Sequence, residues 1–352
     1  MTRWMPFLLI VSAAASGQDS GSAAWTFAVS GDSRNCGDVV MPAIAAAVLH
    51  NHAEFYWHLG DFRAIYSFDE DLVAPPSLHV ASKPLSIGDY ERTAWPDFIA
   101  RQLGPFGNLP IYLTLGNHET VFPMTRERYL VQFADWLEAP TLRAQRLADN
   151  TQDHALRTYY HWVKGNIDFI ALDNATDDQF DSEQLKWFRG VVERDEASSQ
   201  IRTIVVGMHA ALPGSFGSSH SMSDWAQGEK SGREVYNALW HAQDTAHKRV
   251  YVLASHSHFY MEDVFRTDAW KGKVLPGWIV GTAGAVRSPL PPGVNSSRKA
   301  LANVYGYLTG TAAADGSIAF FFHQLNVEDL LHAAQGKVEP AVVHWCYDEN
   351  KR

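Results

Sequence analysis

The sequence predicts an α/β or mixed layered fold, because apolar strand-like runs alternate with helical stretches along most of its 352 residues. Hydrophobic residues make up 46% of the chain, which is enough for one large globular domain with a substantial core. No low-complexity tract or internal repeat interrupts the alternation, so a disordered chain or a solenoid is disfavoured.

The predicted elements follow one another in a regular order. Strands are expected at residues 25–30, 54–59, 111–115, 167–172, 201–206 and 250–254, with two further strands at 277–280 and 318–323. Helices are expected at residues 39–51, 92–103, 182–196 and 234–247. Residues 62–90 and 212–233 fit neither pattern. Both stretches follow motif residues at strand ends, where long loops commonly select the substrate.

Charge and the N-terminal segment limit the partners and the compartment. The formal net charge is −10 and no basic run occurs, which disfavours a nucleic-acid polymer as partner. Residues 1–17 resemble an export signal, with Arg3, an apolar run at 4–11 and small residues at 12–17. An uncleaved anchor is the alternative, but the run is too short to span a bilayer comfortably. We therefore expect a secreted or periplasmic protein without stable membrane insertion.

Cys36 and Cys346 are the only cysteines. An oxidising compartment would permit them to pair, and two buried thiols are the alternative. The sequence leaves both open.

Polar residues with metal-binding side chains follow five of the six main predicted strands. They are Asp32, Asp61, Asn117 with His118 and Glu119, His209, and the pair His256 and His258. Each has an ordinary explanation alone, as a helix cap, a turn residue or a core histidine. Their joint position matters more, because strands that end at one edge of a sheet bring such side chains together there.

The residue types indicate the chemistry. Carboxylate, amide oxygen and imidazole together suit Zn, Mn and Fe. His256 and His258 are alternate residues of an extended segment, so they point the same way and can address neighbouring ions. A carboxylate can bridge two ions, which two-metal hydrolytic sites hold about 3.5–4 Å apart. One or two metal ions of this kind would activate water against a phosphate ester.

The order Asp…Gly-Asp…Gly-Asn-His-Glu…His…His-x-His resembles the calcineurin-like metallophosphoesterase superfamily, which includes the purple acid phosphatases. The motifs run from Asp32 to His258. The resemblance implies a sandwich of two β-sheets flanked by helices, with the site at the C-terminal ends of the strands. It also implies a domain over residues 23–333, which leaves 334–352 as a C-terminal tail.

The resemblance further implies a role for each motif residue. Asp61 would bridge two metal ions. Asn117, His209 and His256 would complete one metal site, and Asp32 and His258 would serve the other. His118 would protonate the leaving alcohol, oriented by Glu119, and a positioned proton donor speeds such a departure ~10²–10⁴-fold. A supporting hydrogen bond is the alternative role for His118.

The chain departs from the family pattern at the first metal site. Arg34 stands where the first motif has a histidine ligand, and Ala64 stands where purple acid phosphatases have a tyrosine, with Tyr66 two residues too late. Ser255 replaces a customary glycine. Arg34 is either a bidentate phosphate clamp or an ion-pairing residue that marks a lost ligand. Water can fill an open ligand position, so the site is weakened rather than abolished.

These observations favour hydrolysis of a small-molecule phosphomonoester or phosphodiester. Two alternatives stay open, namely a one-metal phosphodiesterase that uses Arg34 as a clamp and a non-catalytic scaffold of the same fold. His118 and Glu119 argue against the scaffold, because a scaffold needs neither. Four aromatic or imidazole side chains either stack on the substrate or pack beneath loops: Tyr66, His220, Trp225 and Tyr260.

Overall fold

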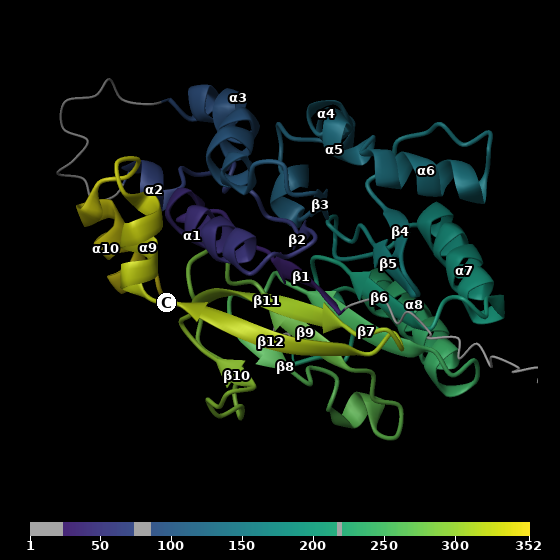
Figure 1. Cartoon of the computed structure of the whole chain (residues 1–352). Coiled ribbons are helices and arrows are strands. Elements are labelled where there is room, and N and C mark those ends of the chain that lie inside the picture. Colours follow the sequence, from purple (N-terminus) through teal and green to yellow (C-terminus); the bar gives the residue numbers. More distant parts are fainter. Residues whose placement is uncertain (1–23, 74–85, 217–219) are drawn as a thin grey trace, which may run out of the picture.

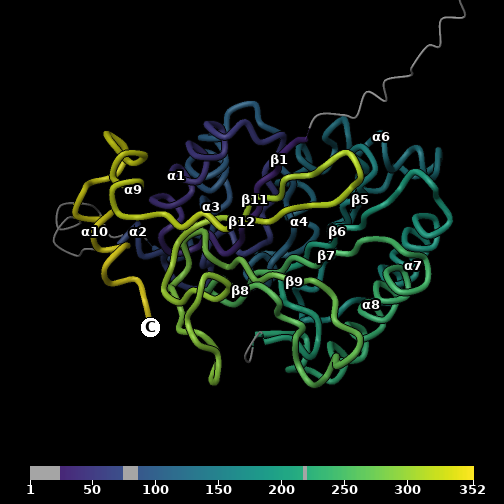
Figure 2. The backbone as a smooth tube through the Cα atoms, turned by 60° about the horizontal axis from the view of Figure 1, so that its bottom comes forward, coloured from purple at the N-terminus to yellow at the C-terminus, as the bar shows by residue number. Residues whose placement is uncertain are grey.

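The computed structural model describes residues 24–73, 86–216 and 220–352 and contains two β-sheets that face each other between layers of helices (Figures 1 and 2). This arrangement confirms the predicted fold class. The export signal expected at residues 1–17 lies outside the described residues.

The first sheet has five strands in the order β12-β11-β1-β2-β3. Three of them are parallel and come from the first third of the chain: β1 (Trp25–Ser30), β2 (Tyr56–His58) and β3 (Ile111–Leu113). The other two pair antiparallel and come from its end: β11 (Tyr305–Ala312) and β12 (Ile318–Leu325). The parallel strands end at one edge of the sheet.

The second sheet has seven strands in the order β10-β8-β9-β7-β6-β5-β4. Its parallel centre consists of β5 (Ile167–Ala171), β6 (Thr203–Gly207), β7 (Arg249–Ala254) and β9 (Gly277–Val280). Antiparallel strands flank it: β4 (Tyr160–Lys164), β8 (Tyr260–Glu262) and β10 (Ala300–Leu301).

The core between the sheets follows from the two-residue period of the strands. Phe27 and Val29 of β1 face the second sheet, whereas Ala28 between them packs with the helices on the outer face. The ring of Phe27 meets that of Phe169 on β5 edge to face at 5.2 Å. Such aromatic contacts fix the position of the two sheets relative to each other. The loops at the strand ends are thereby fixed as well.

Helices cover both outer faces (Figure 1). Those packed with the first sheet are α1 (Gly37–His50), α2 (Glu70–Val73), α3 (Ile87–Phe98), α4 (Arg126–Gln132), α5 (Ala134–Leu137), α9 (Val327–Ala334) and α10 (Pro340–Asp348). Those on the second sheet are α7 (Ser182–Ala197) and α8 (Ala226–Asp244), and α6 (Pro140–Asp149) leads into β4.

Two helices begin five or more residues earlier than predicted, whereas α1 begins only two residues earlier. Helix α3 begins at Ile87 rather than at residue 92, because the Ser86 side chain accepts a hydrogen bond from the Asp89 backbone and caps it. Helix α8 begins at Ala226 rather than at 234. Its Gly228 suggested a loop, but a Cβ there would lie 2.5 Å from the Asp178 carbonyl oxygen. The glycine permits close packing of the helix.

A disulfide joins Cys36 at the start of α1 to Cys346 in α10. The segment 334–352, expected as a tail, thus contributes α10 to the core, with Val342 and Val343 buried. In the described part of the chain, no helix combines the length and apolarity needed to cross a membrane.

Candidate metal centre

The predicted ligands follow the C-terminal ends of parallel strands from both sheets. Asp32 lies two residues after β1, Asp61 three after β2, and Asn117 four after β3. His209 and His256 each lie two residues after a strand of the second sheet, β6 and β7. The two sheets therefore share one site, which their packing places between their ends.

The backbone at the site adopts conformations that ordinary residues avoid. Asp32, Asp61 and His256 have φ angles of 60°, 61° and 64°. Such left-handed conformations cost of order 1–3 kcal/mol and gather at functional sites. Neighbouring loops also touch, since a Cβ on Gly116 would lie 2.3 Å from the Asp61 nitrogen. The glycine of Gly-Asn-His-Glu is therefore required by this contact.

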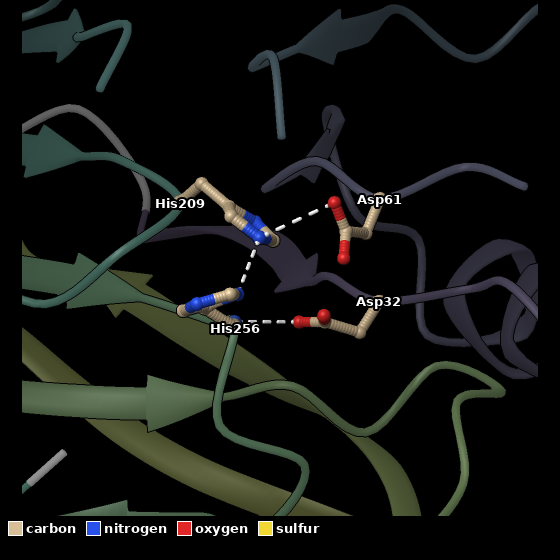
Figure 3. Close-up of side chains that lie close together, drawn as sticks. All are labelled: Asp32, Asp61, His209 and His256. Atoms are coloured by element: carbon tan, nitrogen blue, oxygen red, sulfur yellow. Dashed lines mark hydrogen bonds and ion pairs between the residues drawn. The ribbon is translucent and has the colours of Figure 1, made fainter. Parts of the chain in front are cut away.

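Four ligand atoms converge on a small volume. The His209 Nε2 atom lies 3.0 Å from Asn117 Oδ1, 3.0 Å from His256 Nδ1 and 3.3 Å from Asp61 Oδ1 (the latter two contacts in Figure 3). Metal bonds of about 2.0–2.2 Å place neighbouring ligand atoms about 3.0–3.4 Å apart. The distances from His209 Nε2 to its three neighbours thus match the spacing of atoms that bind one metal ion together.

Hydrogen bonds outside this group orient the ligand atoms. The His209 Nδ1 atom donates to the Leu59 carbonyl oxygen at 2.9 Å, so Nε2 is the ring nitrogen that faces the centre and would bind a metal ion in place of a proton. Asp32 accepts a hydrogen bond from the His256 backbone at 2.7 Å through Oδ2 (Figure 3). These contacts orient the ligands before any ion binds.

Two carboxylate oxygens at the centre are buried without a hydrogen bond. Asp32 Oδ1 and Asp61 Oδ2 accept none from any described residue. A buried charged atom left in this way is costly unless a cation compensates it. Burial opposes ionisation of Asp61, but His118 and His209 outweigh it and hold its pKa well below the usual range. An ionised, buried carboxylate fits a metal ligand.

The remaining residues expected at the first metal site also lie close together. His258 Nε2 lies 3.3 Å from Asp32 Oδ1, and its Nδ1 donates to the Val286 carbonyl oxygen at 2.8 Å. The Arg34 guanidinium lies among them, with Nη2 3.2 Å from His258 Nε2 and Nε 3.3 Å from Asp61 Oδ2. The structure therefore brings all the predicted ligands together, with Arg34 inside the group.

His118 stands beside Asp61, at the edge of the centre. Its backbone nitrogen donates to Asp61 Oδ1 at 3.0 Å, and its Nδ1 donates to the Ala64 carbonyl oxygen at 2.7 Å. Its Nε2 lies 3.7 Å from Asp61 Oδ2. Burial lowers the pKa of His118, and the Arg34 charge adds to this effect while Asp61 opposes it.

The role expected for Glu119 requires a correction. Its carboxylate accepts backbone hydrogen bonds from Asp61 at 2.9 Å, Phe62 at 2.8 Å and Gly116 at 2.8 Å. The carbonyl of Ala64, not Glu119, orients the His118 ring. Glu119 instead ties together the two loops that carry Asp61 and Asn117. A backbone carbonyl leaves no mark on the sequence, so its role could not be predicted.

Asn174 is a supporting residue that the sequence analysis missed. It is buried and holds the backbone next to His209, because Oδ1 accepts from the Ala210 nitrogen at 3.1 Å and Nδ2 donates to the Ala210 oxygen at 2.7 Å. It lies three residues after β5. The rule that found the other site residues, a polar side chain after a strand, would have found it as well.

The surroundings offer room for a substrate. A cavity of about 330 Å³ opens beside His256 and His258 and has walls from Phe259, Pro289 and Leu290. Tyr66 is 61% exposed, with its ring 5.1 Å from that of His118.

The other ring side chains considered as substrate contacts differ in their surroundings. The His220 ring lies 4.9 Å from that of His256, at the site. Trp225 is exposed at the start of α8. Tyr260 instead stacks on Phe322 at 4.0 Å, so it packs within the fold.

Several solved structures are similar to this chain at low sequence identity. A purple acid phosphatase from yellow lupin (Lupinus luteus) seeds superposes with a TM-score of 0.52 at 16% identity, covering 88% of this chain and 55% of that chain. This chain thus spans just over half the length of that protein. A dimetal phosphatase from Danio rerio gives 0.48 at 10% identity, covering 85% and 98%. A metallophosphoesterase from Sphaerobacter thermophilus gives 0.31 at 12% identity, covering 91% and 97%.

The family comparison is more specific. No curated protein matches the chain. The family model for calcineurin-like phosphoesterases matches residues 37–260, which is more than half of the chain and includes every predicted ligand except Asp32. The chain belongs to the calcineurin-like phosphoesterase family.

Proposed function

We propose that this protein hydrolyses a phosphate ester at the metal centre, with Fe, Mn or Zn held by Asp61, Asn117, His209 and His256. The observation that carries the proposal is that Asp32, Asp61, His209 and His256 each bring one ligand atom within 4.8 Å of the others, with Asn117 Oδ1 3.0 Å from His209 Nε2. Family membership supplies the reaction class.

The chain's own residues would prepare the reaction. A bound metal ion supplies a Lewis acid that polarises phosphate oxygens and lowers the pKa of water. His118 would give its Nε2 proton to the departing alkoxide, because the Nδ1 proton is engaged by the Ala64 carbonyl. Glu119 would keep His118 and Asp61 in place by fixing their loops.

Substrate and compartment follow the same proposal. The cavity beside His256 and His258 would take the alcohol part of a small phosphomonoester or phosphodiester. The Cys36–Cys346 disulfide favours an oxidising compartment outside the cytoplasm.

The experiment is hydrolysis of p-nitrophenyl phosphate and bis-p-nitrophenyl phosphate by protein loaded with Mn, Zn or Fe, with and without a chelator. We expect metal-dependent turnover of at least one ester that His209→Ala abolishes. Stoichiometric metal binding with no turnover of either ester, or of an alkyl ester panel, would leave the scaffold alternative in place of the enzyme.

A further inference from the structure

The position that the family resemblance assigns to a first metal ion is taken by a side chain. Its three ligand atoms would be Asp32 Oδ1, Asp61 Oδ2 and His258 Nε2. The Arg34 guanidinium contacts two of them, with Nε 3.3 Å from Asp61 Oδ2 and Nη2 3.2 Å from His258 Nε2. A cation is therefore already present between the atoms that a first metal would need.

The histidine lone pair is committed to this cation. Because His258 Nδ1 donates to the Val286 carbonyl oxygen, the free lone pair is on Nε2. That lone pair faces the Arg34 Nη2 atom, which can only donate. A metal ion at this position would have to displace the guanidinium, whose positive charge repels it.

Arg34 is held in place rather than free to swing away. Its side chain is only 12% exposed, and Nη1 donates to Asn35 Oδ1 at 3.2 Å. Asn35 is itself fixed, because its backbone nitrogen donates to Asp69 Oδ1 at 2.6 Å and its side-chain amide donates to Glu70. The acidic residues after the second motif thus support the loop that carries Arg34.

We propose that Arg34 replaces the first metal ion, so that the centre binds one metal ion per chain, at Asp61, Asn117, His209 and His256. The guanidinium balances the Asp61 carboxylate and stands beside the metal, where a substrate phosphate would meet both positive charges. The role toward phosphate rests on the proposed function. The one-ion stoichiometry does not.

The test is metal content per chain after loading with excess Mn²⁺ or Zn²⁺ and desalting. Wild type should retain one equivalent, and His209→Ala should retain none. Arg34→His restores a ligand and removes the charge, so it should retain two. Arg249→His is the matched control, since Arg249 pairs with Asp315 at the far end of β7, and it should retain one.

Electron paramagnetic resonance of the Mn²⁺ protein adds a readout that does not depend on counting. Wild type should give the six-line signal of an isolated ion, and Arg34→His the signal of an exchange-coupled pair. Two equivalents or a coupled pair in wild type would overturn the proposal, as would a folded Arg34→His protein that still binds one. One equivalent without turnover would instead contradict only the proposed function.

Discussion

Two buried clusters of aspartate and histidine lie in the described part of the chain, and only one of them resembles a metal site. The metal centre lies between the C-terminal ends of the two sheets. The second, which we call the His161 cluster, consists of His161 on β4, Asp168 on β5, Asp149 at the end of α6 and Asp195 on α7. Both bury several ionisable groups, so burial and charge do not distinguish them.

The difference lies in how the imidazoles are used. In the His161 cluster both ring nitrogens are engaged, with Nδ1 2.7 Å from Asp168 Oδ2 and Nε2 2.5 Å from Asp149 Oδ2. Burial would lower the pKa of His161, but Asp168 and Asp149 outweigh it and raise the pKa to about 10. The His161 ring is therefore a cation whose two N–H groups both donate to carboxylates. At the metal centre, burial is likewise outweighed by Asp61, which raises the pKa of His209 to about 10. However, His209 Nε2 faces three other candidate ligand atoms at once, with His256 Nδ1 and Asn117 Oδ1 at 3.0 Å and Asp61 Oδ1 at 3.3 Å.

This contrast indicates which buried clusters bind ions. At the metal centre, ligand atoms of Asp32, Asp61, His209 and His256 from both sheets lie within 4.8 Å of one another, so one cation can bind several of them together. In the His161 cluster the imidazolium between two carboxylates already compensates their charge and stabilises the fold instead. Convergence of ligand atoms from several strand ends, rather than acidic or histidine content, marks the functional cluster.

The largest effect should come from opening the metal centre. In His209→Ala one ligand is lost, so metal affinity should fall by more than the ~10–100-fold that losing a mere supporting hydrogen bond costs. Hydrolysis should become undetectable. Isothermal titration with Zn²⁺ measures this, with His161→Leu as the counterpart that should bind normally. Equal losses of metal affinity in the two variants would contradict the difference that we draw between the two clusters.

A smaller effect is expected at His118, which serves the reaction and not the metal. His118→Gln should lower kcat ~10²–10⁴-fold for esters with alkyl leaving groups, because an alkoxide needs a proton to depart. A nitrophenolate leaves unaided, so the loss for nitrophenyl esters should be much smaller. Metal content should be unchanged. An equal loss for both kinds of ester would remove His118 as the acid.

A mutation in the His161 cluster should change the stability of the fold rather than the activity. His161→Leu leaves the buried Asp168 without its cation and Asp149 with Arg194 alone, and should destabilise the fold by about 3–5 kcal/mol, with kcat and metal content unchanged. Because folding raises the pKa of His161 from 6.5 to about 10, its contribution is complete below pH 6.5 and is lost as the pH rises through about 10. Denaturant unfolding across this range measures the difference between variant and wild type. A difference that grows with pH would contradict the assigned charge.

The smallest effect expected is the change in melting temperature on removal of the metal, compared between wild type and His161→Leu. Removing the metal with a chelator should lower the melting temperature, since an ion at 100 times its Kd stabilises the native state by about 2.7 kcal/mol. Calorimetry of wild type and His161→Leu should show the same metal-dependent increment, because the clusters share no residue. A markedly different increment would mean that the His161 cluster takes part in metal binding.

The sequence predicted most strands that are rich in apolar residues and missed several whose apolar pattern is short or interrupted. Strand β1 was predicted with its observed bounds. Strand β4 escaped because His161 and Lys164 interrupt its apolar pattern. Strand β11 contains Gly306 and Gly310, which disfavour a strand in isolation, although a Cβ on Gly310 would lie 2.4 Å from the Phe27 ring. Only the packing of the sheets shows why glycine is required there.

At the site, the side chains could be predicted but not their partners. The motif order led to the ligands, because strand ends converge in any sheet of this kind. It could not show that Arg34 lies between Asp61 and His258, since three segments distant in the chain create that contact. Nor could it assign Glu119 to backbone amides, because those donors belong to every residue type alike.

The most direct test is a crystal structure of the Mn-loaded protein with anomalous scattering. We predict one strong peak, about 2.0–2.3 Å from ligand atoms of Asp61, Asn117, His209 and His256, and none at the His161 cluster. No peak within bonding distance of these four side chains, or a peak at His161 instead, would contradict the account.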